Sequence, residues 1–292
     1  MKAGFVGLGI MGARMAARLV KGGHDLVVYN RTPGKSGPLE KAGARAARTP
    51  ADAARGVQVL FTMLSTPEAV SSTAFGPHGF LQELPKGSLW VDSSSVNPSF
   101  SRQAAAEAAA HGVRFMDAPV TGSLPFAEKG ELTFLVGGAA ADLEEARPLL
   151  ELMGKTIRHL GAVGMGAALK MVINMQLGTL MAVFSEALAL GESLGLSRTT
   201  LLDILVGGPV TGPFLAGKRE KLQSGRYDAE FPLKWQRKDL HLACATAYEQ
   251  GVSLPIINAA KEVFTNAVAE GLGDLDFSGV AELYRRRGTV EA

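Results

Sequence analysis

The chain has 292 residues, a formal net charge of +2, 47% hydrophobic and 20% charged residues, and one cysteine. This length suffices for one large or two ordinary domains with a buried core, and the composition excludes a disordered chain. The small charge gives no indication of a nucleic-acid partner, and the single cysteine, Cys244, excludes an internal disulfide and favours a cytoplasmic location.

The apolar segments do not predict a membrane partner. The N-terminal apolar run is interrupted by Arg14 and Arg18, unlike a signal peptide. The longest uncharged apolar segment, Met171 to Ser185, is shorter than the roughly 18 residues of a membrane span and contains Asn174. We therefore expect it to form a buried helix.

A glycine-rich turn opens the chain. A short buried strand is predicted at Ala3 to Val6, a helix at Met11 to Val20 and a second strand at Asp25 to Tyr29. The glycines between the first strand and the helix have the spacing G-x-G-x-x-G, which permits a tight turn, close approach of a pyrophosphate, and helix–strand packing. A tight turn without a ligand is the alternative. We predict a dinucleotide site that includes Gly7, Leu8, Gly9, Ile10, Met11 and Gly12.

The residues after the second strand indicate which dinucleotide binds. An NAD-specific site places Asp or Glu there to bind the adenosine ribose, but this chain has Asn30, Arg31 and Thr32. A guanidinium can donate charge-assisted hydrogen bonds to a 2′-phosphate, which a carboxylate would repel. We expect NADPH to be preferred over NADH. The alternative is that Arg31 is a solvated loop charge and both cofactors are accepted.

Strands and helices alternate through the first half of the chain. This alternation is typical of an α/β, Rossmann-type, doubly wound and mainly parallel sheet, with its ligand at the carboxyl ends of the strands. Further strands are expected at Val57 to Met63, Ser88 to Asp92, Val113 to Asp117, Leu132 to Val136 and Ile157 to Leu160, and helices at Pro38 to Ala42, Ala51 to Arg55, Phe100 to His111 and Asp142 to Met153.

Past Gly166 the strand signals almost vanish. Apolar residues recur at helical spacing from Ala167 to Leu194, which predicts one long helix. We expect an NADP-binding domain over residues 1–163 and an all-helical substrate and oligomerisation domain over residues 164–292, with the substrate in a cleft. The other helices are expected at Thr199 to Val206, Phe214 to Gln223, Leu233 to Gln250, Pro255 to Glu270 and Phe277 to Arg286.

Candidate cofactor ligands follow two predicted strands. Met63 and Leu64 end one strand, and Ser94 and Ser95 follow the next. Both pairs are expected at the sheet edge where a dinucleotide lies. The serines either hydrogen-bond the nicotinamide or a ribose, or cap the following turn.

A small polar loop follows a third strand. The hydroxyls of Thr121 and Ser123 and the backbone N–H groups around Gly122 suit a substrate carboxylate. A polar turn without a ligand is the alternative.

Lys170 and Asn174 lie four residues apart near the start of the long helix and share one face of it. A lysine in a cleft can give a proton to a carbonyl oxygen as hydride reaches the carbon, and Asn174 could hold the amine. The alternative is a lysine that reaches solvent. Lys238 and Asp239, taken alone, suit a solvated helix face. The five histidines lack metal-ligand spacing, so no metal site is predicted.

These motifs together resemble the β-hydroxyacid dehydrogenase family, which includes 3-hydroxyisobutyrate dehydrogenase, and within it the glyoxylate/succinic semialdehyde reductases. The resemblance covers nearly the whole chain. It is carried by residues 7–12, Asn30-Arg31-Thr32, Asp117-Ala-Pro-Val, Lys170-Met-Val-Ile-Asn174, Phe231-Pro-Leu-Lys, Lys238-Asp239-Leu240 and Gly271-Leu-Gly-Asp-Leu-Asp-Phe277.

The resemblance implies an enzyme that reduces small carboxylate-bearing aldehydes, such as glyoxylate or succinic semialdehyde, with NADPH. Lys170 would be the general acid or base and Asn174 would orient it. The remaining roles would be substrate carboxylate binding by Thr121, Gly122 and Ser123, substrate contact by Phe231 and Asp239, and cofactor contact by Lys238. The resemblance also implies a homo-oligomer, a dimer or tetramer, formed through the helical domain.

Two departures from the family pattern affect the expected substrate. Thr121 stands where the family usually has Ser, and Leu124-Pro125-Phe126 replaces a stretch that looks like Lys-Lys-Pro in the semialdehyde reductases. We expect weaker activity with succinic semialdehyde. The alternatives are a 3-hydroxyisobutyrate or 2-hydroxy-3-oxopropionate type of dehydrogenase, an imine-reducing relative, and a cofactor-binding assembly module without turnover. Lys170 argues against the imine-reducing relative, where a Tyr or Asp usually takes its place.

Overall fold

The computed structural model describes residues 1–285 of the chain. The chain divides into two compact units, Met1–Met171 and Val172–Ala292.

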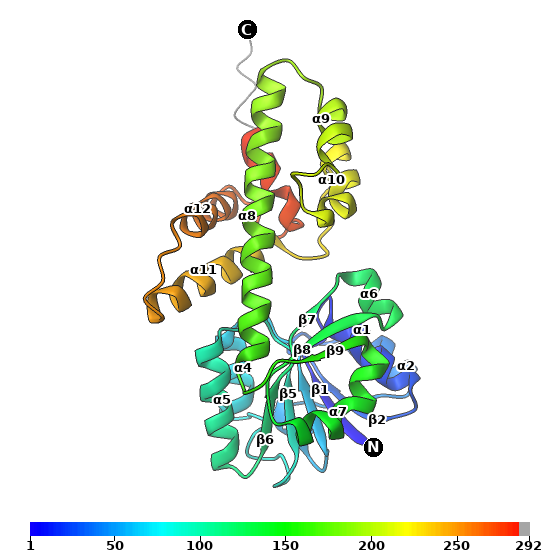
Figure 1. Cartoon of the computed structure of the whole chain (residues 1–292). Helices are drawn as coiled ribbons and strands as arrows, with labels where there is room; N and C mark the ends of the chain where they lie inside the picture. The colour runs from blue at the N-terminus through cyan, green and yellow to red at the C-terminus, as the bar shows by residue number, and fades with distance from the viewer. Residues whose placement is uncertain (286–292) are drawn as a thin grey trace. The chain divides into compact units, whose positions relative to one another are not determined.

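The first unit is built on a six-stranded sheet in the order β3-β2-β1-β4-β5-β6, in which every pairing is parallel. Figure 1 labels β1, β2, β5 and β6 of this sheet. Successive strands are added on one side of β1 and then on the other, so the strand order reverses at β1, where ligands of such sheets bind. The strands are β1 (Lys2–Val6), β2 (Asp25–Tyr29), β3 (Arg45–Ala46), β4 (Val59–Thr62), β5 (Leu89–Asp92) and β6 (Arg114–Asp117).

Both faces of this sheet are buried. Phe5 and Phe61 pack with helices α1 and α7 in one apolar cluster, whereas Val6 and Trp90 pack with α3, α4 and α5 in another. Consecutive residues of one strand thus point into different cores, which confirms the doubly wound sheet. The helices of this unit are α1 (Gly12–Lys21), α2 (Gly37–Lys41), α3 (Pro50–Ala54), α4 (Pro67–Phe75), α5 (Pro98–Ala110), α6 (Leu124–Lys129) and α7 (Ala140–Met153).

A second, three-stranded sheet was not expected from the sequence. It has the order β7-β8-β9, and its strands are β7 (Val120–Thr121), β8 (Leu132–Val136) and β9 (Gly154–His159). β7 pairs antiparallel with β8, and β9 pairs parallel with it. The segments expected to extend the parallel sheet therefore form a separate one. The reason lies at the end of β6, where Asp117 and Gly137 exchange two backbone hydrogen bonds, of 3.0 and 2.8 Å, in an antiparallel bridge.

The long helix α8 (Met165–Ser193) forms as one continuous element, as predicted. By length and composition alone it is the one helix among the described residues that could cross a membrane, a test that core helices of soluble proteins also pass. The expectation that this helix is buried is only partly correct, because only 33% of its most apolar 18-residue stretch is buried. Val183 and Leu190 are 56% and 63% exposed, and Leu194, just after the helix, is 73% exposed.

The described part of the second unit is helical apart from an isolated bridge between Pro232 and Asp276. The segments expected as helices from 214 and from 277 each begin as a 3₁₀ helix, and the end of the second, Arg286, lies outside the described residues. The elements are α9 (Arg198–Leu205), η1 (Pro213–Lys218), α10 (Arg219–Ser224), α11 (Leu233–Glu249), α12 (Pro255–Ala269), η2 (Phe277–Ala281) and α13 (Glu282–Arg285).

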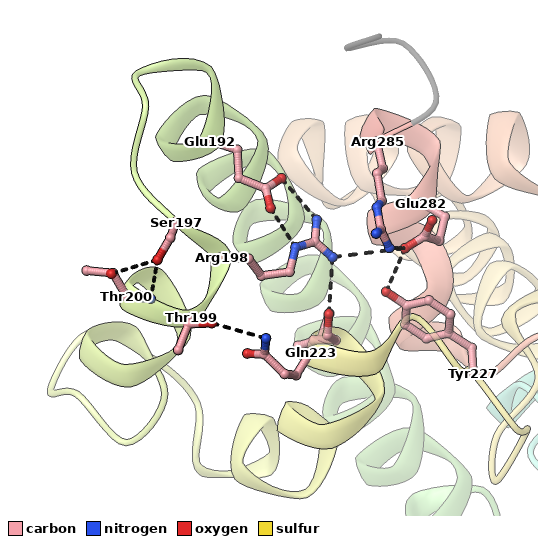
Figure 2. Close-up of polar contacts among 10 residues, drawn as sticks. Glu192, Ser197, Arg198, Thr199, Thr200, Gln223, Tyr227, Glu282 and Arg285 are labelled. Carbon is pink, nitrogen blue, oxygen red and sulfur yellow. Dashed lines mark hydrogen bonds and ion pairs between the residues drawn. The ribbon is translucent and has the colours of Figure 1, made fainter.

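Arg198 joins several of these helices through polar contacts (Figure 2). Its guanidinium binds both carboxylate oxygens of Glu192, at 2.6 and 3.0 Å, and donates to the Leu222 carbonyl at 3.1 Å. The hydrogen bonds to Glu192 raise the pKa of Arg198. Nearby, the Tyr227 hydroxyl donates to Glu282 at 3.0 Å, and burial of this hydroxyl raises its pKa. The charged groups of this cluster are therefore already paired with one another, and they connect neighbouring helices of the second unit.

Candidate functional site

The glycine-rich turn between β1 and α1 is shaped by two of its three glycines. Gly7 has φ +101°, and a Cβ at Gly12 would overlap the Gly7 carbonyl oxygen. These two positions therefore exclude side chains for reasons of backbone geometry and packing. A Cβ at the exposed Gly9 would meet nothing within 4 Å. The open space at Gly9, beside the first turn of α1, fits the approach of a pyrophosphate.

Asn30 connects this turn to the end of β2. Its side-chain oxygen accepts a hydrogen bond from the Leu8 N–H at 2.9 Å, and its side-chain nitrogen donates to the Thr32 carbonyl at 3.1 Å. Arg31 and Thr32 are exposed just after it. Asn30 thus fixes the backbone that presents the Arg31 guanidinium.

The predicted residues after β4 and β5 lie at the same sheet edge. The Met63 N–H donates to the Val6 carbonyl at 2.9 Å, and a Cβ at Gly7 would crowd Met63 and Leu64. The Ser94 hydroxyl accepts a hydrogen bond from the Leu64 N–H at 2.9 Å. Ser94 is 1% exposed, so this contact ties the loop after β4 to the loop after β5. Ser95 follows and is half-buried.

Of the three residues expected in the carboxylate loop, Thr121 lies in a strand instead. Thr121 belongs to β7, where it pairs with Thr133. Gly122 is exposed with φ +115°, and Ser123 is exposed just before α6. The structure thus places Gly122 and Ser123 at an exposed corner between a strand and a helix.

Asp117 has a role that the sequence analysis missed. Its carboxylate, 1% exposed, accepts hydrogen bonds from the N–H groups of Gly164 at 2.6 Å and Ala167 at 2.7 Å, at the start of α8. Burial raises the pKa of Asp117 from 3.8 to about 6, against the opposing effect of these two bonds. Asp117 therefore fixes the start of the helix that carries Lys170. Its partners lie about 50 residues away in the chain, so no local pattern could reveal them.

Asn174 lies in a buried polar cluster on the largely apolar α8. It is 3% exposed, and its side-chain nitrogen donates to the Asp239 carboxylate at 2.6 Å. The other oxygen of Asp239 pairs with the Lys238 ammonium at 2.7 Å. Asp239 is 3% exposed, so it does not lie on a solvated helix face. Lys170 is half-buried one turn before Asn174 on α8.

Phe231 is held by a second buried carboxylate. Its N–H donates to Asp276 at 3.3 Å, and its ring lies 5.8 Å from the Phe277 ring. Asp276 is fully buried and also pairs with the Lys218 ammonium at 3.1 Å. Phe231 is therefore fixed through its backbone and through its ring.

Comparison with known proteins identifies the family. Residues 2–161 match the family model described as the NAD-binding domain of 6-phosphogluconate dehydrogenase, and residues 164–284 match the NAD-binding model of NADP-dependent 3-hydroxyisobutyrate dehydrogenase. The chain belongs to the β-hydroxyacid dehydrogenase family. This confirms the resemblance drawn from the motifs.

Three relatives illustrate the similarity. Glyoxylate/succinic semialdehyde reductase 1 of Arabidopsis thaliana is 41% identical, over 97% of this chain and 98% of its own length. The chloroplastic reductase 2 of the same plant is 38% identical, over 99% of this chain and 81% of its own. A solved structure of 3-hydroxyisobutyrate dehydrogenase from Mycobacterium tuberculosis with L-serine is 32% identical, with a TM-score of 0.83 over 97% of this chain and 99% of that one.

The family, the fold and the glycine turn together establish the class of protein. This β-hydroxyacid dehydrogenase is an oxidoreductase with a nicotinamide-dinucleotide fold. The glycine turn, Asn30, Met63, Leu64 and Ser94 form one connected group within the first unit. Asn174, Lys238 and Asp239 form another within the second.

Proposed function

We propose that this protein uses NADPH to reduce small carboxylate-bearing aldehydes, such as glyoxylate or succinic semialdehyde, to hydroxy acids. One observation carries the proposal. Asn174 is buried, its side chain is bonded to Asp239, and it lies one turn after Lys170 on an apolar helix. Burying such polar groups costs free energy, which a catalytic role explains.

The bound cofactor supplies the hydride. We propose that the Lys170 ammonium gives a proton to the carbonyl oxygen, and that the Lys170 amine accepts it back when the alcohol is oxidised. The side-chain nitrogen of Asn174 is committed to Asp239, so its side-chain oxygen is the group left to orient the Lys170 ammonium.

We propose the substrate contacts that the family resemblance implies. Thr121, Gly122 and Ser123 hold the substrate carboxylate, since the corner at Gly122 and Ser123 is exposed. Phe231 and Asp239 contact the substrate, and Lys238 contacts the cofactor. Leu124, Pro125 and Phe126 form the apolar start of α6 and bring no cation for a distant second carboxylate. We therefore propose that glyoxylate is a better substrate than succinic semialdehyde.

The preference for NADPH rests on the end of β2. Arg31 is exposed there, and no carboxylate stands among residues 30–32 to repel a 2′-phosphate. A guanidinium matches phosphate geometry through paired hydrogen bonds.

We further propose a homo-oligomer, a dimer or a tetramer, formed through the helical unit. Val183 and Leu190 on α8, with Leu194 just after it, leave an exposed apolar surface that a second copy would cover. The single cysteine supports a cytoplasmic location. The proposal includes neither a nucleic-acid nor a membrane partner.

The test is NADPH oxidation with a panel of glyoxylate, succinic semialdehyde and a cyclic imine, with 3-hydroxyisobutyrate in the oxidative direction. Lys170→Ala should lower kcat by at least about 100-fold, since it removes the acid, while NADPH binding by fluorescence titration is retained. Lys261→Ala, which removes a mostly buried lysine of α12, is the matched control. Near-normal turnover by Lys170→Ala would exclude the proposed role. NADPH binding without turnover of any compound by the wild type would favour the assembly module.

A further inference from the structure

A second side chain of α11 contacts the same turn of α8 as Asp239 does. The Gln236 side-chain nitrogen donates to the backbone carbonyl of Asn174 at 2.8 Å, and Gln236 is fully buried. Gln236 and Asp239 are three residues apart, so they lie on one face of α11. Asn174 is thus held by its side chain through Asp239 and by its backbone through Gln236.

Gly178 makes room for this contact. A Cβ at position 178 would overlap the side-chain nitrogen of Gln236. Gly178 also lies four residues after Asn174, where its N–H is the regular helical partner of the Asn174 carbonyl. The Gln236 amide therefore adds a second donor to a carbonyl of a regular helix, and only a glycine at 178 leaves space for it.

Stability does not explain why an amide is present at this position. The side-chain oxygen of Gln236 is buried and has no hydrogen-bond partner within residues 1–285. Leaving such an acceptor unpaired costs free energy, which an apolar side chain of the same length would avoid. The unpaired oxygen therefore offsets the free energy that the hydrogen bond to the Asn174 carbonyl contributes to the fold.

We propose that Gln236 is a positioning residue for the reaction: it fixes the turn of α8 that carries Asn174, and so sets the direction of the Lys170 ammonium one turn earlier. This inference rests on the proposed function of Lys170. A displacement of a reacting group by about 1 Å can cost about 100-fold in rate, so one hydrogen bond at this turn is enough to matter.

The experiment compares kcat, the KM for NADPH and thermal unfolding in the full chain. Gln236→Met keeps the length of the side chain but removes the donor. It should lower kcat about tenfold, with little change in the KM for NADPH or in Tm. Thr246→Val is the matched control, because Thr246 is also on α11 and its buried hydroxyl has no partner among the described residues. Its kcat should equal that of the wild type.

Two further variants test the contact itself. Gly178→Ala should also lower kcat, because the new methyl displaces the Gln236 amide, and adding it to Gln236→Ala should cost little more. Gln236→Glu places a carboxyl opposite the Asn174 carbonyl, where only its protonated form can donate. Burial raises the pKa of such a group, so the kcat of Gln236→Glu relative to the wild type should rise as the pH falls.

The outcomes separate this inference from the proposed function. If the wild type reduces aldehydes but Gln236→Met keeps full kcat, or loses Tm while keeping kcat, Gln236 has no positioning role. Additive losses for Gly178→Ala and Gln236→Ala would equally overturn it. If the wild type reduces no aldehyde while binding NADPH, both proposals fail together.

Discussion

Asp117→Asn is the change that tests the start of α8 most directly. Asp117 is buried, and burial raises its pKa from 3.8 to about 6 although Gly164 and Ala167 donate hydrogen bonds to it. Asparagine has nearly the same shape and keeps one acceptor oxygen, but it does not titrate. The variant therefore removes the proton equilibrium while leaving most of the packing in place.

The magnitude follows from the two pKa values. A rise of about 2 units corresponds to about 3 kcal/mol of pH-dependent stability. Because the folded chain holds this proton more tightly than the unfolded chain, the stabilisation is fully present below pH 3.8 and is lost as the pH rises through about 6.

The assay is denaturant unfolding of the wild type and of Asp117→Asn across this pH range. Other carboxyl groups contribute equally to both proteins and cancel in the difference. The wild-type free energy of unfolding minus that of the variant should fall by about 3 kcal/mol between about pH 3 and about pH 7. A difference that stays constant, or that grows with pH, would show that burial does not control this carboxyl group.

Four other substitutions test the cofactor turn and the helical unit. Arg31→Ser should weaken NADPH binding by at least about tenfold and NADH binding much less, measured by fluorescence titration. Equal weakening of both would mean that Arg31 does not contact the 2′-phosphate. Gly12→Ala should destabilise the fold by about 1–3 kcal/mol because its methyl overlaps the Gly7 carbonyl, whereas Gly9→Ala, with open space around it, should keep Tm and lose cofactor affinity; unchanged affinity in Gly9→Ala would place the pyrophosphate elsewhere. Asp276→Asn should lower the free energy of unfolding by about 3 kcal/mol, since it removes the charge beside the buried Lys218, and a loss below about 1 kcal/mol would mean that Glu230 alone compensates that charge.

Most of the strands were predictable because they carry strong local signals, but the two-residue strand Arg45–Ala46 of the parallel sheet was not predicted. Segments such as Asp25–Tyr29 and Leu132–Val136 are short apolar runs bounded by turn residues, and the structure has strands with those bounds. The assignment of Leu132–Val136 to a second sheet was not predictable. It depends on the two-residue strand Val120–Thr121 and on the bridge between Asp117 and Gly137, which have no periodicity of their own.

In the candidate site, too, the local spacing was predictable and the long-range contacts were not. The four-residue spacing of Lys170 and Asn174 was visible in the sequence, and it places both on one face of a helix. The bond from Asn174 to Asp239 spans 65 residues, and that from Gln236 to the Asn174 carbonyl spans 62. Whether a polar residue of α11 is solvated or buried depends on which face meets α8, and packing settles that after the helices form.

The carboxylate of Asp117 ties the last residue of a strand to the first turn of a helix that begins many residues later. For protein engineering this means that positions 117, 164, 166 and 167 form one module, because a Cβ at Gly166 would also approach the Asp117 carboxylate. A chimera that joins this nucleotide-binding sheet to the helices of another relative should transfer these four positions as a set. A graft that keeps the strand but places side chains at 164 and 166 would displace the backbone N–H groups that bind the buried carboxylate.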